Sequence, residues 1–205
     1  MCALFLSLHV CLCVHRTFTI STLDGGNPAS GAVHSPYKQA VGMRAAQGLL
    51  ANASGTVAAL PFMPPQYSSS SAGPGGVVTI KLADAGLYSA PPVLNSSVGC
   101  PPAIGAKNCE SFAILGPDCV WHNATATIGS GGTLLLKSEP PLKECLGSRA
   151  SYANWPVVTV TNKAGVPLLP WVEPVSPSAA AKCPHAWPPV PIHTRRAADS
   201  SSDVA

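Results

Sequence analysis

A histidine that directly precedes a helix signal is the residue of this chain best suited to chemistry. His34 is followed by Ser35, a good helix N-cap, and by Pro36 at the first helical position, where a missing N–H costs nothing. A loop that runs into a helix cap can hold an imidazole ring rigidly enough to accept a proton from a hydroxyl group. The pattern therefore indicates a general base that acts on a serine nucleophile.

The helix that follows is predicted from its hydrophobic spacing. Apolar residues recur every four positions and predict one buried helix face that ends near Asn52; these residues are Tyr37, Val41, Ala45 and Leu49. Residues 17–23, before the loop, are rich in Thr, Phe and Ile and are typical of a strand. We expect this strand, loop and helix to be the end of an α/β layer.

Two blocks of residues resemble motifs of the sialate O-acetylesterase family of SGNH-type hydrolases. The first is similar to an Ile-His-Pro-x-x-Lys-Gln-x-Val-Gly-x-Arg block and matches it at His34, Lys38, Gln39, Val41, Gly42 and Arg44. The second is similar to the end of the family's last domain and matches it at Arg149, Tyr152, Pro156, Asn162, Gly165, Val166, Pro167, Pro170 and Trp171. A strand with a Gly-Leu turn and a Trp-x-x-Ala-x-Ala segment lie between the blocks in the family's order, so the resemblance extends over residues 24–171.

This resemblance implies hydrolysis of O-acetyl esters of sialic acid, or of another acetylated sugar, by serine esterase chemistry without a cofactor. His34 would accept the serine proton and then donate a proton to the sugar hydroxyl that leaves. Related enzymes carry an orienting aspartate shortly before the histidine, where this chain has Gly31 and Ala32. Asp24 is the upstream acidic residue and is therefore the candidate orienting carboxylate.

The nucleophile of such an esterase is missing from the sequence. The chain contains no Gly-Asp-Ser, Gly-Gln-Ser-Asn or Gly-x-Ser-x-Gly segment. We therefore expect a C-terminal fragment that carries the catalytic-type histidine and is inactive alone. Residues 1–16 form an apolar start that is either signal-like or a gene-model artefact, and their apolar stretch is too short to span a membrane.

Composition favours a secreted or lumenal glycoprotein of the secretory or lysosomal pathway. Charged residues make up 10% of the chain and the net charge is +3, which argues against a nucleic-acid partner. The chain has eight cysteines, and Asn52, Asn95 and Asn123 begin N-glycosylation sequons. Some disulfide pairing is expected among three neighbouring cysteines, with connectivity left open: Cys100, Cys109 and Cys119. No Cys-x-x-Cys or His-x-x-x-His pair is present, so we expect no metal site.

The fold class expected from these patterns is α+β. The end of the α/β layer (17–52) would be followed by a flexible linker (53–76), a mainly antiparallel β-sandwich-like region (77–172) and a Pro/Ala/Ser-rich disordered tail (173–205) in which Trp187 stays exposed. The predicted strands of the β-rich region are 77–82, 111–115, 124–128, 133–136 and 157–161.

Two other classes of function remain open. A non-catalytic secreted β-sandwich module would bind carbohydrate on an aromatic platform formed by Trp121, Tyr152 or Trp155, although such residues more often belong to a core. A Pro- and Ser-rich extracellular structural protein would explain the linker and the tail but not the two ordered blocks. Without the residues around it, His34 would be an ordinary loop histidine.

Overall fold

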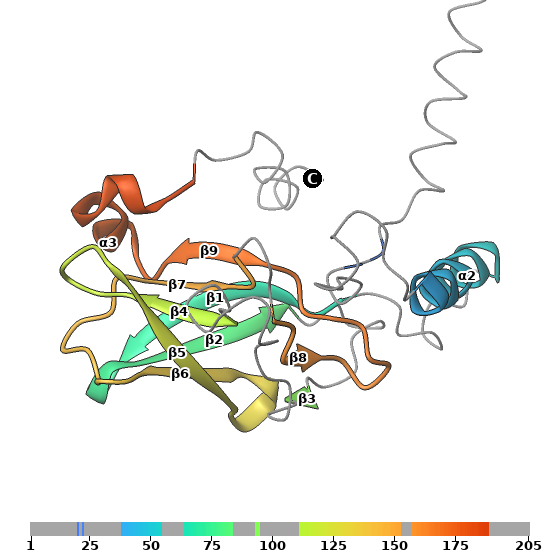
Figure 1. Cartoon of the computed structure of the whole chain (residues 1–205), viewed down its shortest axis with the longest axis horizontal. Coiled ribbons are helices and arrows are strands. Elements are labelled where there is room, and N and C mark those ends of the chain that lie inside the picture. Colours follow the sequence, from blue (N-terminus) through green and yellow to red (C-terminus); the bar gives the residue numbers. More distant parts are fainter. Residues whose placement is uncertain are drawn as a thin grey trace, which may run out of the picture.

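The computed structural model describes residues 20, 22, 38–54, 64–83, 93–94, 111–152 and 157–188. Most of the described strands form one antiparallel sheet of seven strands in the order β1-β2-β6-β5-β4-β7-β9, and β3 pairs with β8 in a second sheet (Figure 1). The elements are α2 (Lys38–Ser54), β1 (Gln66–Gly73), η4 (Pro74–Gly76), β2 (Val77–Ala83), β3 (Val93–Leu94), β4 (Phe112–Leu115), β5 (Trp121–Ile128), η6 (Ser130–Gly132), β6 (Leu134–Ser138), β7 (Gly147–Ala150), β8 (Val160–Thr161), β9 (Trp171–Pro174), α3 (Pro177–Lys182) and η7 (Pro184–Ala186).

The two end strands of the large sheet approach each other, so that the sheet is nearly closed. The Tyr67 ring on β1 stacks on the Trp171 ring on β9, with 5.5 Å between the ring centroids. Just before these strands, the Leu169 amide donates a hydrogen bond of 3.0 Å to the Pro65 carbonyl. The described β-rich region is therefore mostly one nearly closed antiparallel sheet, with few helices and a small second sheet, in place of the expected β-sandwich-like arrangement.

The main core lies on the inner face of the curled sheet. Val78 and Ile80 alternate along β2 and are fully buried, and they stand opposite Leu136 and Leu134 of β6. Alternation of this kind places every second side chain of a strand on one face. Each such aliphatic side chain contributes about 1.5–3 kcal/mol when it leaves water.

The loop after β8 is held by a buried asparagine. The Asn162 side chain is 1% exposed, and its Oδ1 accepts hydrogen bonds of 2.9 Å from the backbone amides of Ala164 and Val166. Gly165 has a φ of 74°, a left-handed conformation that glycine adopts at little steric cost. This turn consequently has a fixed conformation in which the Gly165 carbonyl is available to an outside donor.

Each of the five predicted strands overlaps an observed strand, but the sequence did not predict β1, β3, β7 and β9. β1 lies within the segment 53–76 that we expected to be a flexible linker, and this expectation is wrong over Gln66–Gly73. Its serines are mostly exposed, yet its backbone pairs with β2 from Gln66 to Gly73, with one irregularity between Tyr67 and Ser69. Backbone pairing, which does not depend on side-chain hydrophobicity, is the reason that this polar segment forms a strand.

The expected disordered tail is also wrong as far as residue 188. Ser176 caps α3 by accepting a hydrogen bond of 3.1 Å from the Ala179 amide, and Pro177 occupies the first helical turn. Trp187 is half-buried rather than exposed, because its Nε1 donates to the Ala180 carbonyl at 3.1 Å and its ring packs on β7 beside Gly147. Residues 189–205 lie outside the described part, and the division of the chain into domains stays a prediction.

Candidate functional site

The two residues predicted to do chemistry, His34 and Asp24, both lie outside the described residues. The strand and loop expected around them, over 17–37, are also outside that part apart from residues 20 and 22. The described element that follows them is α2, whose first residue, Lys38, comes four positions after His34. The SGNH-type layer and the catalytic roles of both residues therefore stay predictions.

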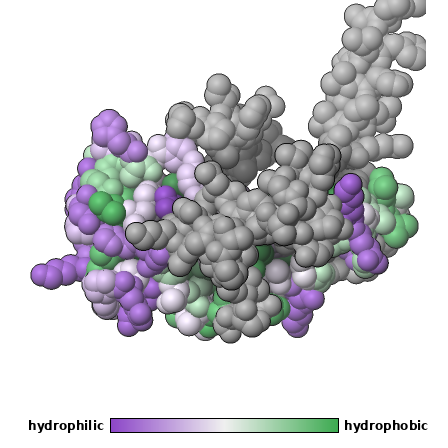
Figure 2. Space-filling model, in the orientation of Figure 1, coloured by the Kyte–Doolittle hydropathy of each residue, from purple (hydrophilic) through white to green (hydrophobic). Residues whose placement is uncertain are grey.

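The face of α2 that is buried differs from the one predicted. Arg44 is 6% exposed and Gly48 is also buried, whereas Leu49 is 61% exposed and Val41 and Ala45 are only half-buried. The hydrophobic spacing was misleading because the helix contacts the β-rich region through the side that carries Arg44. Part of the apolar surface of α2 is visible at one end of the molecule (Figure 2).

Arg44 connects the two blocks of the family resemblance in space. Its Nη2 donates a hydrogen bond of 3.0 Å to the carbonyl of Gly165, 121 residues later in the chain. The partner of this hydrogen bond is a backbone carbonyl oxygen. Lys38, at the start of the same helix, is exposed. The helix next to the His34 loop is thus anchored to the ordered turn after β8.

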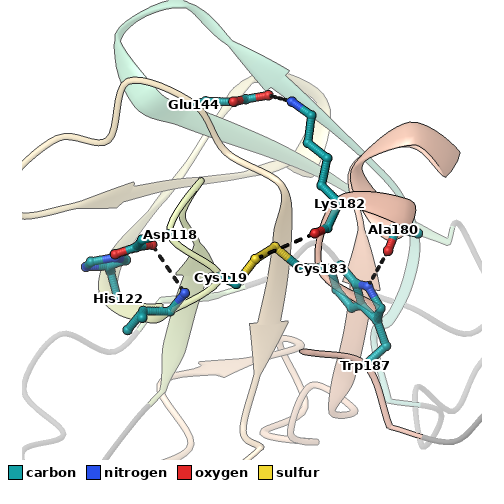
Figure 3. Close-up of a disulfide and its surroundings, with 9 residues drawn as sticks. Asp118, Cys119, His122, Glu144, Ala180, Lys182, Cys183 and Trp187 are labelled. Atoms are coloured by element: carbon teal, nitrogen blue, oxygen red, sulfur yellow. Dashed lines mark hydrogen bonds and ion pairs between the residues drawn. A yellow bond between two sulfur atoms is a disulfide. The ribbon is translucent and has the colours of Figure 1, made fainter. Parts of the chain in front are cut away.

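A histidine–carboxylate pair that the sequence analysis did not predict lies at the turn between β4 and β5. The His122 Nε2 is 3.2 Å from Oδ1 and 3.1 Å from Oδ2 of Asp118 (Figure 3). The hydrogen bond from His122, with a further one from the Val120 amide, holds the pKa of Asp118 below its usual value. Gly116 lies directly under the pair, and a Cβ there would meet both side chains.

The geometry of this pair fits a turn stabiliser better than a catalytic dyad. Both side chains are substantially exposed, at 31% for His122 and 51% for Asp118. The same ring nitrogen contacts both carboxylate oxygens, and Asp118 Oδ1 also accepts the Val120 amide at 3.2 Å, which closes the turn. Among the described residues, no group of three or more His, Cys, Asp and Glu side chains could hold a metal ion.

A disulfide joins this turn to the end of α3. Cys119 pairs with Cys183, 64 residues later, with 5.6 Å between their Cα atoms (Figure 3). The expected pairing among Cys100, Cys109 and Cys119 is therefore wrong for Cys119, and the other two cysteines lie outside the described residues. Cys145 is the free cysteine of the described part; it is buried, and burial raises the pKa of its thiol.

Of the three aromatic residues considered as a sugar platform, Trp121 is engaged in contacts within the protein. The Arg149 guanidinium lies over its ring at 4.6 Å from the centroid, and the Trp187 ring meets it in an edge-on arrangement at 5.9 Å. Tyr152 is 49% exposed, and Trp155 lies outside the described residues. The geometry of Trp121 indicates a structural cluster rather than an open stacking surface.

No helix within the described ranges has the length and apolar character needed to cross a membrane. No protein-family model matches the sequence, and no curated protein matches it. Among solved structures, the fold is similar to that of a carbohydrate acetylesterase from Xanthomonas citri, with a TM-score of 0.56 and 24% sequence identity. The alignment covers 73% of this chain and 31% of that one, so this chain matches about a third of the length of its structural neighbour. The likeness shows a shared fold; membership of the sialate O-acetylesterase family stays a prediction.

Proposed function

We propose that this chain is part of a carbohydrate ester hydrolase that removes acetyl groups from sialic acid or another acetylated sugar. The observation that carries the proposal is the fold it shares with a carbohydrate acetylesterase over 73% of its length. Two further observations add support. The two residue blocks occur in the order of the family, and Arg44 of the first block donates a hydrogen bond to Gly165 of the second.

In this proposal, His34 is the general base. A serine outside the present sequence attacks the acetyl carbonyl and passes its proton to the imidazole, and the imidazole then protonates the sugar oxygen that leaves. Water then attacks the acetyl-enzyme with the help of the same imidazole, which releases acetate and restores the serine. Asp24 orients the imidazole, and the helix that follows the His34 loop is anchored through Arg44.

The 205-residue chain by itself is expected to lack esterase activity that depends on His34. Because it holds no serine-nucleophile block, the chain is expected to hydrolyse p-nitrophenyl acetate no faster than its own His34→Ala variant. Turnover that depends on His34 in this chain would contradict the assignment of the nucleophile to another polypeptide segment.

The decisive test uses a longer polypeptide in which the same residues follow a serine-nucleophile block. An O-acetylated sialic acid and an acetylated xylo-oligosaccharide are the substrates, and released acetate is measured. His34→Ala is expected to lower turnover by about 10²–10⁴-fold, the usual contribution of a general base. His122→Ala, which changes the other histidine–carboxylate pair, serves as the matched control and is expected to leave turnover unchanged.

Circular dichroism of both variants shows whether the fold is retained. Unchanged acetate release in a folded His34→Ala variant would remove His34 from the mechanism, and loss of activity in His122→Ala alone would move the site to the β4–β5 turn.

A further inference from the structure

We propose that Asn123 is an N-glycosylation site and that its oligosaccharide stands on the outer face of β5. Asn123 begins the sequon Asn123-Ala124-Thr125, which lies in the middle of that strand. The proposal is independent of the proposed esterase function, because it uses neither His34 nor the contacts of α2.

The acceptor side chain is exposed and lies on the face of β5 opposite the main core. Asn123, Thr125 and Thr127 are all exposed and alternate with Ala124 and Ala126, which pack against the main core. An N-linked sugar is large and strongly solvated, so its acceptor must point away from the core. The alternation along β5 gives Asn123 that direction.

The residue opposite Asn123 on the neighbouring strand is small and buried. Asn123 stands opposite Ala113 of β4, whose small side chain does not project beyond the backbone by more than a methyl group. Beyond it, Arg149 of β7 occupies the same row but its guanidinium lies over the Trp121 ring. On this side Asn123 is thus bordered by a small, buried residue of β4, and the Arg149 side chain extends to Trp121, two residues before Asn123 on β5. The Asn123 side chain itself is exposed, and this exposure gives the sugar access to solvent.

The disulfide supports the cellular route that the modification requires. Cys119 lies four residues before Asn123 and is bonded to Cys183, and structural disulfides form and persist in oxidising compartments. N-linked oligosaccharides are added in such a compartment, which in eukaryotic cells is the lumen of the endoplasmic reticulum. The same segment of chain thus carries both the sequon and the bond expected of a lumenal protein.

The structure describes an exposed acceptor side chain only for Asn123 among the three sequons. Asn52 lies inside α2, two residues before that helix ends at Ser54, and Asn95 follows β3 outside the described residues. Both are followed by serine at the second position, whereas Asn123 is followed by threonine, the better acceptor hydroxyl. Asn123 is therefore the site that we assign.

The transfer requires a polyprenyl-diphosphate-linked oligosaccharide as the co-reactant. The Nδ2 atom of Asn123 attacks the anomeric carbon of the first sugar, and a carbon–nitrogen bond forms. The bond between that carbon and the diphosphate oxygen breaks, so that the polyprenyl diphosphate leaves. The amide nitrogen loses one proton and nothing is oxidised or reduced.

The test is secretion of the full 205-residue chain from insect cells behind a heterologous signal peptide. The purified protein is treated with peptide N-glycosidase in heavy-oxygen water and mapped by mass spectrometry, which converts a glycosylated asparagine into a labelled aspartate. A non-reducing map of the Cys119–Cys183 bond confirms that the secreted protein has folded. We expect the label at position 123.

Two variants provide a matched comparison at the same sequon. Thr125→Ala destroys the acceptor motif and is expected to remove one glycan from the electrophoretic pattern, whereas Thr125→Ser preserves the motif and is expected to retain it. An unlabelled asparagine at position 123 in the secreted, disulfide-bonded protein would overturn the proposal. So would an unchanged glycan count in Thr125→Ala.

Discussion

The Arg44 side chain links α2 to the turn after β8. It is almost completely buried and donates to the Gly165 carbonyl, so its loss removes a charge-assisted hydrogen bond between α2 and the turn after β8. We expect Arg44→Met to lower the free energy of unfolding by about 1–3 kcal/mol. Urea unfolding followed by circular dichroism measures this change.

Lys38→Met is the control for this substitution, since Lys38 is an exposed cation on the same helix. It is expected to change the free energy of unfolding by no more than about 0.5 kcal/mol. Equal losses in the two variants would mean that the contact of Arg44 with Gly165 contributes nothing specific.

Two glycines are expected to respond to alanine with opposite signs. A Cβ at Gly147 would collide with the Trp187 ring, whose Cζ3 would lie 2.8 Å away, so Gly147→Ala is expected to lower the free energy of unfolding by about 1–3 kcal/mol. At Gly42, inside α2, no heavy atom lies within 4 Å of the added Cβ. Gly42→Ala is therefore expected to raise the free energy of unfolding by about 0.5–1 kcal/mol. Tryptophan fluorescence during urea unfolding measures both changes in unfolding free energy. A Gly42→Ala variant that is less stable than the wild type would show that the helix propensity of alanine does not determine stability at this position.

The Asp118–His122 pair predicts a pH dependence of stability with a definite sign. The pKa of Asp118 is below its ordinary value of 3.8 because the folded state favours the carboxylate. The unfolded chain thus binds this proton more readily, and the stabilisation is complete above the ordinary value and lost as the pH falls through the lower folded value. The difference in unfolding free energy between the wild type and Asp118→Asn should shrink as the pH falls below the ordinary value and through the lowered pKa of Asp118. A difference that stays constant over this range would show that the pair does not stabilise the turn.

At the scale of elements, the Cys119–Cys183 bond holds the α3–η7 segment to the β4–β5 turn. We expect the double variant Cys119→Ala, Cys183→Ala to lose about 2–4 kcal/mol of unfolding free energy, since the cross-link restricts the unfolded chain. Thermal unfolding under non-reducing conditions measures the loss. Lys182→Met is the matched control, because Lys182 lies at the end of α3 and its substitution removes only an exposed ion pair with Glu144. This variant should lose no more than about 1 kcal/mol of unfolding free energy.

The elements that the sequence predicted are those with runs of β-branched or apolar residues. The strands β2, β4 and β6 each carry such a run, and their positions agree closely with the prediction. β7 reads Gly-Ser-Arg-Ala and has no such signal; it is a strand because β4 and β9 pair with it on both sides. Long-range pairing of this kind cannot be recognised from local composition.

The candidate site was predictable only in part for similar reasons. His34 has a local signal, the helix cap that follows it, and its role stays a prediction because it lies outside the described residues. The Asp118–His122 pair forms because the chain turns tightly between β4 and β5. The local sequence of this turn does not by itself predict that the two side chains meet. Cys119 and Cys183 are 64 residues apart, and no spacing rule selects that partner.

At the scale of the whole molecule, closure of the large sheet depends on contacts between its two end strands. Tyr67 on β1 stacks on Trp171 and its hydroxyl lies 3.0 Å from the Ser70 hydroxyl, and burial raises the pKa of this phenol. Tyr67→Ala is expected to lower the free energy of unfolding by roughly 2–3 kcal/mol, somewhat less than for a fully buried aromatic residue. Tyr152→Ala removes a tyrosine that is 49% exposed and should change stability by no more than about 0.5 kcal/mol. The urea midpoints of the two variants measure these losses. A loss in Tyr152→Ala as large as that in Tyr67→Ala would argue against a stabilising effect of the contact between β1 and β9.

The approach of β1 to β9 also bears on how copies of this polypeptide behave when they are concentrated. An open sheet offers unpaired amide and carbonyl groups to any passing strand, which is a common beginning of aggregation. Here the terminal strands face one another, and an invading strand would first have to separate the Tyr67 and Trp171 rings and break the bond from Leu169 to Pro65. We therefore expect the β-rich region to remain dispersed at concentrations at which a flat sheet of the same length would polymerise.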